Sequence, residues 1–264
     1  MANYESVIVE RQGPVAILTM NRPEKMNTFN AALRRDMCLA ARELNLDTSI
    51  QVVLLTGAGR AFGAGADLTE AQGDGLGGGA EVQDQLEYEY KPGVLAIAES
   101  SKVWIAAING PCAGVSYSYA MACDMVVMAE SAFLYQPFAT IGLIPDGGST
   151  WLLSRLVGSR KAFELMITGE KLSAQDAAKL GLANQVFPDD QFLDTAMGYS
   201  QNIASKSPLA LRYTKEAIKI AHSATLAESI SAEARLQKNC VDSDDCKNAV
   251  AAFFNKEKYT WLGR

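Results

Sequence analysis

The chain has 264 residues, of which 48% are hydrophobic and 20% are charged, a composition typical of a globular protein with a substantial core. Its formal net charge is −6, with no run of Lys or Arg and no apolar run of membrane-spanning length, so neither nucleic acid nor a membrane is expected as its main partner. A single His and five Cys without metal-hook spacing argue against a metal centre.

The first part of the chain predicts a hairpin, a helix and a buried strand, at residues 7–10 with 15–20, 27–46 and 52–55. Asn27 or Asn30 can cap the helix, because both side chains accept hydrogen bonds from free backbone amides. A further helix is predicted to start within residues 66–71.

The middle of the chain alternates strands and helices. Helices are predicted at residues 83–99 and 114–122, and strands at 103–108 and 125–129. Residues 73–79 (GDGLGGG) predict a flexible loop. This alternation indicates an α/β core.

Beyond Ser149 helical patterns dominate. They cover residues 173–179, 189–204, 209–221, 226–239 and 242–254, with one strand signal at 185–187. We therefore place a boundary near residue 200, between a core of residues 1–200 and a helical region of residues 201–264. The N-terminus lacks a secretory signal pattern and the odd number of Cys shows no disulfide framework, so we expect a cytoplasmic protein.

Two stretches have the composition of anion-binding loops. Residues 60–68 follow a strand and carry small residues at their centre, which lets backbone approach a ligand closely. Residues 109–116 follow the next strand and open a helix, whose first amides are unpaired and lie at the positive end of the helix dipole. A simple turn explains each stretch equally well when it is taken alone.

Residues 141–148 (IGLIPDGG) place one carboxylate, Asp146, on a Gly/Pro-rich turn. Together with backbone donors, one carboxylate favours proton transfer next to a carbonyl, whereas two would favour addition of water. The alternative is structural, with Asp146 capping the helix that starts at Ser149. His222 lies in the late helical region, where we interpret it as a residue of a helix surface rather than as a base for a Ser nucleophile.

Six stretches, in this order along nearly the whole chain, resemble the crotonase superfamily, the enoyl-CoA hydratase/isomerase family. They are Asn21-Arg22-Pro23, residues 59–68, Asn109-Gly110, Ala122-Cys123-Asp124, residues 142–148 and the tail at 251–256. The resemblance implies a spiral of ββα units followed by a helical trimerisation region, assembled as a homotrimer or a dimer of trimers.

The resemblance also implies an acyl-CoA thioester as substrate, with coenzyme A as part of it and no separate cofactor. It assigns the oxyanion hole to the amides of Ala64 and Gly114. Contacts to coenzyme A are implied for a set of residues in three segments: Lys25 and Met26, then Ala66, Asp67 and Leu68, and Lys256 in the tail. It also implies that the 73–79 loop lies over the acyl pocket.

The departures from the family pattern bear on the reaction. Hydratases of the family carry a Glu four residues past the oxyanion-hole glycine and another after a Gln-Pro pair, and these positions hold Ser118 and Phe138 here. The Pro-Asp-Gly-Gly pattern resembles instead the phenylacetate-pathway isomerases, which use an Asp as acid/base. The resemblance thus implies an enoyl-CoA isomerase with Asp146 as acid/base, in an apolar pocket to which Phe138 and Tyr117 contribute.

Three alternatives remain. The first is a hydratase with relocated carboxylates, Asp146 with Glu87 or Glu89. The second is a related reaction such as aryl-CoA dehalogenation, with Asp146 as nucleophile. The third is a protein that binds acyl-CoA without turnover.

Overall fold

The computed structural model describes residues 4–70 and 78–263. Its centre is a six-stranded sheet of order β1-β2-β3-β4-β6-β9, in which only the β1–β2 pair is antiparallel. The strands are β1 (Val7–Gln12), β2 (Val15–Met20), β3 (Val52–Gly57), β4 (Val103–Ile108), β6 (Met125–Ala129) and β9 (Gln185–Phe187). The predicted hairpin and the α/β class are thereby confirmed.

A second, three-stranded sheet pairs β5 (Pro111–Ala113), β7 (Phe133–Tyr135) and β8 (Lys171–Ser173). The sequence analysis missed all three strands. Each has only three residues, which is too short for an alternating pattern to be recognised.

Seven helices of the described residues belong to the core. They are α1 (Ala31–Leu46), α2 (Gly79–Gln85), α3 (Lys91–Ala98), α4 (Val115–Met121), α5 (Ser149–Thr168), α6 (Ala174–Lys179) and α7 (Phe192–Ala204). Short helical turns are η1 (Pro23–Lys25), η2 (Leu86–Tyr90), η3 (Phe138–Ile141) and η4 (Asp189–Gln191). Asn30, not Asn27, caps α1 by accepting a hydrogen bond from the amide of Leu33.

Two predicted helices differ from the structure. The single helix expected at residues 83–99 is interrupted by a π-helical turn, η2, between α2 and α3. Residues 66–70 form a bridge and turns rather than the start of a helix. Of the predicted 73–79 loop, residues 73–77 lie outside the described part of the chain, whereas Gly78 and Gly79 begin α2.

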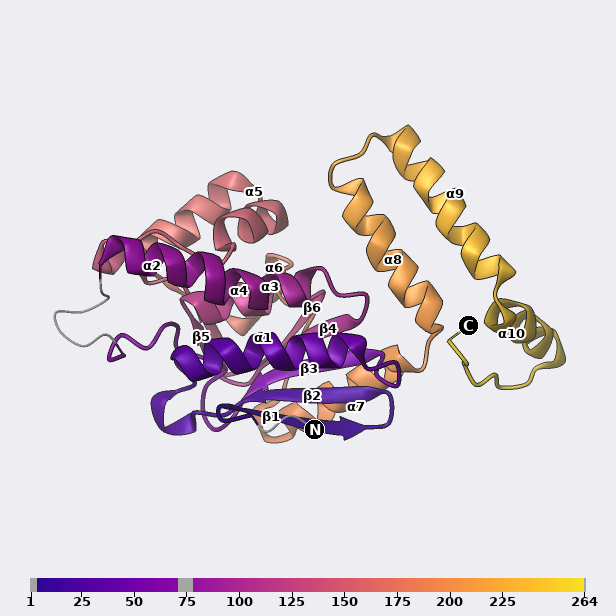
Figure 1. The fold of residues 1–264 in the computed structure, drawn as a ribbon, viewed down its shortest axis with the longest axis horizontal. Coiled ribbons are helices and arrows are strands. Elements are labelled where there is room, and N and C mark those ends of the chain that lie inside the picture. The colour runs from indigo at the N-terminus through magenta and orange to yellow at the C-terminus, as the bar shows by residue number, and fades with distance from the viewer. Residues whose placement is uncertain (1–3, 71–77, 264) are drawn as a thin grey trace.

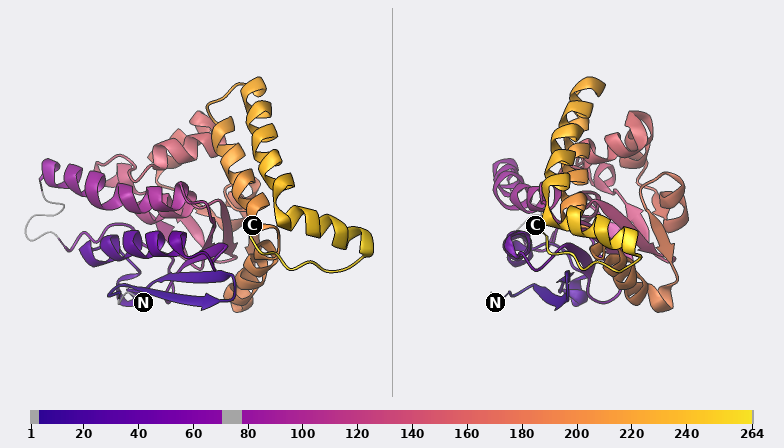
Figure 2. Two further views of the ribbon diagram at one scale, coloured as in Figure 1. Left: turned by 45° about the vertical axis from the view of Figure 1, so that its right-hand side comes forward. Right: turned by 90° about the vertical axis from the view of Figure 1, so that its right-hand side faces the viewer.

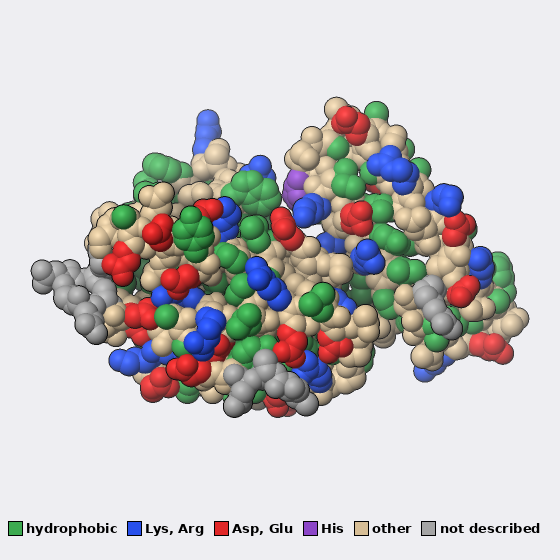
Figure 3. All heavy atoms as spheres, viewed as in Figure 1, with side chains coloured by type: hydrophobic (Ala, Val, Ile, Leu, Met, Phe, Trp, Pro, Cys, Tyr) green, Lys and Arg blue, Asp and Glu red, His purple; other side chains and the backbone are tan. Residues whose placement is uncertain are grey.

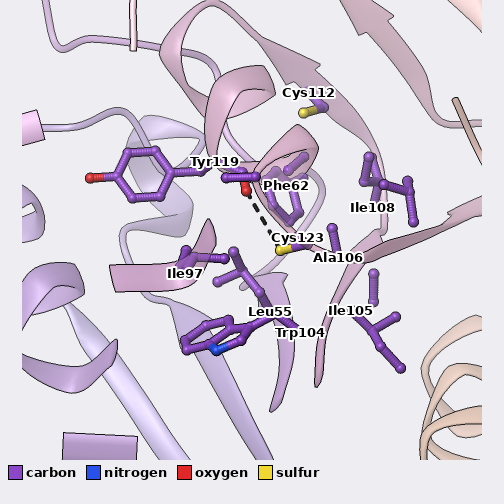
Figure 4. Close-up of a cluster of buried hydrophobic side chains, with 14 of the residues drawn as sticks. Leu55, Phe62, Ile97, Trp104, Ile105, Ala106, Ile108, Cys112, Tyr119 and Cys123 are labelled. Atoms are coloured by element: carbon purple, nitrogen blue, oxygen red, sulfur yellow. Dashed lines mark hydrogen bonds between the residues drawn. The ribbon is translucent and has the colours of Figure 1, made fainter. Parts of the chain in front are cut away.

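The core is continuous across the sheet and the helices that cover it. Every residue of β3 and β4 is buried, which is expected for central parallel strands with both faces covered. Figure 4 shows Leu55, Trp104 and Ile97 packed together, with Phe62 and Tyr119 beside them. This packing fixes the strand ends from which the loops described below emerge.

The last three helices, α8 (Pro208–Ala221), α9 (Leu226–Asp242) and α10 (Asp244–Asn255), form an arm that stands out from the core (Figures 1 and 2). It is tied back by Lys215 of α8, whose Nζ lies 2.8 Å from Asp124 Oδ2 and 3.0 Å from the carbonyl of Lys102. Apolar side chains lie exposed along the arm (Figure 3), among them Ile218, Leu226, Ile230, Val241, Phe253 and Phe254. None of the helices in the described residues is apolar over a length that would cross a bilayer.

Strands β2, β3, β4 and β6 run parallel, so their carboxyl ends meet at one edge of the sheet. The arm lies at the opposite end of the molecule, with α10 far from the first turn of α1 (Figure 1). The loops after β3 and β4 therefore converge at the edge remote from the arm.

Candidate functional site

The loops after β3 and β4 touch each other at two glycines. Gly63 and Cys112 form a parallel bridge, in which the Gly63 amide donates to Pro111 and the Ala113 amide donates to Gly63. Two residues further along each loop, a Cβ on Gly114 would lie 3.3 Å from the Cα of Gly65. Gly114 has φ +55° and Gly65 has φ +96°, backbone conformations that favour glycine. The small residues recognised in the sequence thus let the two loops approach each other closely.

The amides at this junction differ from the predicted donors. The Ala64 amide donates to the carbonyl of Met26 at 3.0 Å, and the Gly114 amide donates to the carbonyl of Tyr135 at 3.1 Å. Because both hydrogens are already engaged, the geometry argues against Ala64 and Gly114 as oxyanion donors. Within the described part of the chain, no acceptor is recorded for the amides of Ala66 and Val115.

The free amides have a clear local origin. Ala66 forms a parallel bridge with Phe29, but the hydrogen bonds of this bridge are made by the residues on either side of Ala66. The Phe29 amide donates to the carbonyl of Gly65, and the Asp67 amide donates to the carbonyl of Phe29, so the Ala66 amide takes no part. Val115 follows Gly114 and is the first residue of α4, where an amide has no acceptor within the helix. The junction of the two loops therefore offers two unpaired backbone donors, one of them at a helix N-terminus.

Asn27 organises this region, and the sequence analysis gave it only a capping role. Its side chain is fully buried. Its Oδ1 accepts a hydrogen bond from the Arg22 amide, and its Nδ2 donates to the carbonyls of Ala58 and Ala61. Its φ is +55°, a backbone conformation that is uncommon outside glycine, Asn and Asp. The only signal in the sequence was the residue type, because Asn tolerates this conformation. Asn27 thereby joins the loop after β2 to the loop after β3.

Asp146 lies in the turn before α5, and this turn packs against the first turn of α4. A Cβ on the next residue, Gly147, would approach Val115 Cγ2 and Ser118 Cβ to 3.0 Å each, so this turn packs directly on the helix. The Oδ1 atom of Asp146 is buried, and no hydrogen-bond partner for it is found among the described residues. Burial raises the pKa of the Asp146 carboxyl to about 6, an effect that the residue's own backbone amide partly offsets.

The Asp146 side chain does not cap the helix that starts at Ser149, which was the structural alternative for this residue. The residue before α5 is Gly148, and no side chain caps that helix. Asp146 contributes only its backbone carbonyl, which accepts a hydrogen bond from the Ser149 amide at 3.0 Å. The carboxyl itself is left available.

Aromatic side chains surround the junction. Phe138 is buried, with its ring edge 3.9 Å from where a Cβ on Gly114 would lie, so it borders the site as predicted. Tyr117 is buried too, but its described surroundings include Leu134 and Gln136 in a separate small cavity. On the Ala66 side, Phe29 stacks on Tyr119 with ring centroids 4.7 Å apart and lies 5.9 Å from Tyr90.

Tyr90 was not recognised from the sequence. Its ring is buried, and the Arg34 guanidinium lies over it, 5.4 Å from the ring centroid. The pKa of Tyr90 is raised to about 12, mainly by burial; Arg34 acts against this rise, and the charge of Asp146 adds to it. The phenol and the carboxyl therefore share one electrostatic environment, although they are far apart in the chain.

A cavity of about 620 Å³ begins at Ala66 and extends between the first turns of α1 and the α2–η2 segment. Phe29, Leu68 and Tyr88 supply apolar wall. Arg34 is almost fully buried, with Nε 2.6 Å from Glu89 and Nη1 2.7 Å from Glu70. This cavity has the size of a small-molecule pocket, and Ala66, which carries one of the two free amides, is among its lining residues.

The carboxylates considered for a relocated hydratase site are engaged elsewhere. Glu89 pairs with Arg34, as described above. Glu87 is half exposed and forms an ion pair with Lys91, one turn along the same helical segment. In this structure Asp146 has neither of them as a hydrogen-bond partner.

The residues predicted to bind coenzyme A fall into two groups. Met26 and Ala66 lie at the loop junction, with Lys25 exposed beside Met26 in η1. Asp67 accepts hydrogen bonds from Arg22 and Thr69, and these bonds outweigh its burial, so the pKa of its carboxyl is lowered. Lys256 instead ends α10 on the arm, and within one chain the structure does not bring it to the junction (Figure 1).

His222 lies at the end of α8, exposed, with its ring 6.4 Å from that of Trp151 in the first turn of α5. Among the described residues no group of three or more His, Cys, Asp or Glu is arranged to hold a metal ion. The site consists of two free amides, one buried carboxyl and an adjoining pocket. Such an arrangement can stabilise an oxyanion and move a proton beside it.

Comparisons with known proteins identify the family. A family model described as enoyl-CoA hydratase/isomerase matches residues 10–264. A probable enoyl-CoA hydratase of Rhizobium meliloti is 36% identical over 256 residues, 97% of each chain. A 1,2-epoxyphenylacetyl-CoA isomerase of Escherichia coli is 34% identical over 260 residues, 98% of this chain and 99% of its own.

Solved structures give the same result. An enoyl-CoA hydratase from Bacillus anthracis superposes with a TM-score of 0.93 at 30% identity, covering 98% of this chain and 100% of its own. One from Polaromonas sp. gives 0.90 at 31% identity, covering 97% of this chain and 99% of its own. These similarities confirm the predicted fold class and the resemblance stated from the sequence.

Proposed function

The chain belongs to the enoyl-CoA hydratase/isomerase family, and from that premise we propose that it is an enoyl-CoA isomerase that uses Asp146 as its acid and base. The observation that carries the proposal is the Asp146 carboxyl, whose Oδ1 is buried and unpaired among the described residues, on a turn whose next residue, Gly147, packs against Val115. Ser118 and Phe138 stand where hydratases of the family are expected to carry their two glutamates, and neither side chain exchanges protons near neutral pH.

The reaction then follows from the geometry in two proton transfers. The Asp146 carboxylate takes a proton from carbon 2 of a 3-enoyl-CoA, and the electrons of that C–H bond delocalise over the thioester and the double bond. The resulting oxyanion accepts hydrogen bonds from the amides of Ala66 and Val115. The protonated Asp146 returns the proton to carbon 4, which leaves a 2-enoyl-CoA of unchanged mass.

The surroundings of Asp146 support this double role. A carboxyl with a pKa of about 6 is still mostly ionised at neutral pH, and its carboxylate is a stronger base than one of ordinary pKa. A pKa nearer the operating pH also lets the group hold the proton between the two transfers. The cavity of about 620 Å³ that begins at Ala66 offers a place for the acyl or pantetheine part of the substrate. In this proposal coenzyme A enters as part of the substrate, and no separate cofactor takes part.

The test is a parallel assay of purified protein on 3-enoyl-CoA and 2-enoyl-CoA substrates, followed by mass spectrometry and ultraviolet absorbance. Conjugation that appears from the 3-enoyl substrate without a change of mass supports the isomerase. Gain of one water on the 2-enoyl substrate, with no isomerisation, rejects it in favour of a hydratase. A covalent ester on Asp146 with an aryl-halide substrate would identify a dehalogenase, and binding without turnover would identify a carrier.

We also propose that the arm assembles the chain into a trimer or a dimer of trimers. The exposed apolar side chains of α8, α9 and α10 support this, because soluble proteins rarely leave so many large ones uncovered on adjoining helices. Light scattering on the full chain tests it, and a monodisperse monomer at micromolar concentration would contradict it.

A further inference from the structure

Three buried polar side chains form a line that ends on the main chain of Asp146. Gln136 Nε2 lies 3.0 Å from Ser149 Oγ, Ser149 Oγ lies 2.6 Å from Ser118 Oγ, and Ser118 Oγ lies 2.8 Å from the Asp146 carbonyl oxygen. Ser118 and Ser149 are fully buried, and Gln136 is 2% exposed. The three come from α4, from α5 and from the segment between β7 and η3, so only the fold brings them together.

The direction of each hydrogen bond is fixed by the number of protons available. The Asp146 carbonyl can only accept, so the single hydroxyl proton of Ser118 is donated to it. Ser149 must then donate to Ser118, and its own oxygen accepts from the amide group of Gln136. Turning the Gln136 amide over would leave the Ser118–Ser149 contact without a proton. The line therefore runs one way, from Gln136 to Asp146.

These hydrogen bonds end on the turn that contains Asp146, Gly147 and Gly148. Among the described residues, no other side chain donates a hydrogen bond to this turn. The Asp146 carbonyl accepts two hydrogen bonds, from the Ser118 hydroxyl and from the Ser149 amide. Gly147 and Gly148 follow with φ of +58° and +89°, and the space at Gly147 is too tight for a Cβ. The carboxyl of Asp146 takes no bond from these serines, so their influence on it passes through the backbone.

We propose that Ser118, Ser149 and Gln136 are positioning residues that hold the Asp146 main chain and thereby keep its carboxyl where Oδ1 is buried and unpaired. The inference rests on the proposed function, since it matters to turnover only if Asp146 carries the reaction. It gives Ser118 a definite role at the position where hydratases are expected to carry a glutamate.

The test compares Ser118→Ala with Ser200→Ala. Ser200 is also fully buried, and its hydroxyl also donates to a backbone carbonyl, that of Ala196, at 2.8 Å, but it lies on α7. We expect Ser118→Ala to lower kcat about 10- to 100-fold with KM within about threefold, because a small misplacement of a catalytic group costs that much. The acid limb of its pH–rate profile should shift to lower pH, since a released turn lets water reach the carboxyl. Identical kcat values and pH profiles for the two variants would overturn the proposal.

A second variant and a second readout keep the test decisive. Ser149→Ala cuts the line one step earlier and should give a smaller loss in the same direction, and it substitutes for Ser118→Ala if that chain does not fold. The pKa of Asp146 can be followed by carbon-13 NMR of labelled Asp, with the signal assigned from Asp146→Asn. If the wild-type protein isomerises no 3-enoyl-CoA, the proposed function fails, and this titration alone decides the positioning role. A pKa of Asp146 unchanged in both serine variants would reject it.

Discussion

The Cα of Gly65 lies so close to Gly114 that a Cβ on Gly114 would approach it to 3.3 Å. This contact brings together two loops that leave the sheet from neighbouring strands, β3 and β4. The residues that follow the two glycines, Ala66 and Val115, carry the backbone amides for which no acceptor is recorded in the described chain. The relation of these two glycines therefore places the two amides that we propose as oxyanion donors.

The role of the Val115 amide can be tested by removing that one hydrogen. Proline is tolerated at the first position of a helix, so Val115→Pro deletes the donor with little cost to α4. We expect kcat to fall about 10²- to 10³-fold, the usual effect of losing one oxyanion donor. Val115→Ala is the matched control, since it removes the side chain and keeps the amide. Equal kcat values for the two variants would show that the amide takes no part.

Asp146→Asn keeps the shape of the side chain and removes its ability to exchange a proton. We expect turnover of 3-enoyl-CoA to fall by orders of magnitude while binding of the CoA thioester, measured by calorimetry, is retained. Asp190→Asn, a change on the exposed surface, serves as control. Wild-type kinetics in Asp146→Asn would exclude Asp146 as the acid/base.

The pKa of Asp146 predicts a pH dependence of activity. Because the carboxylate form must take the first proton, kcat/KM should rise with pH through a midpoint of about 6 and then level off. The measurement is kcat/KM for a 3-enoyl-CoA between pH 4.5 and 8.5. A profile that is flat across this range would mean that another group, or none, limits the first transfer.

The same shift predicts that Asp146 destabilises the fold at neutral pH. Its pKa is raised from 3.8 to about 6 in the folded chain, so the folded state binds the proton more tightly than the unfolded state does. Stability is therefore lost as pH rises through about 6. Asp146→Asn should raise the free energy of unfolding above pH 6 by on the order of 1–2 kcal/mol, with the gain vanishing below about pH 4. Urea unfolding at fixed protein concentration across this range measures it, and a gain independent of pH would contradict it.

The hydratase alternative requires Glu87 or Glu89 to act as a second catalytic carboxylate. Glu87→Gln should leave turnover unchanged, because its carboxylate is half exposed and pairs with Lys91. Glu89→Gln should reduce stability rather than kcat, because it weakens an ion pair of the buried Arg34. Hydration of a 2-enoyl-CoA that is abolished by either change would mean that a second carboxylate does act in this site.

The sequence by itself determined the α/β class, the succession of most long helices and strands and the glycine-rich loops, and it singled out Asp146 as the candidate acid/base. These follow from patterns that are local: apolar periodicity, turn residues, and a motif whose order along the chain resembles one family. The amides that we propose as donors lie one or two residues from those that the resemblance implied, because a sequence gives the loop but not which of its hydrogens already has an acceptor. Ala64 and Gly114 donate within the backbone, and only the path of the chain shows it.

Tertiary structure alone decided the remainder. The three short strands β5, β7 and β8 form only because each is held by its neighbours. Tyr90 reaches the electrostatic environment of Asp146 across 56 positions of sequence, and Gln136, Ser149 and Ser118 meet only through the packing of α4 against α5. Local pattern dictates which element a residue belongs to, whereas burial, the partner of each proton and the pKa of a carboxyl depend on contacts between segments that are distant in the chain.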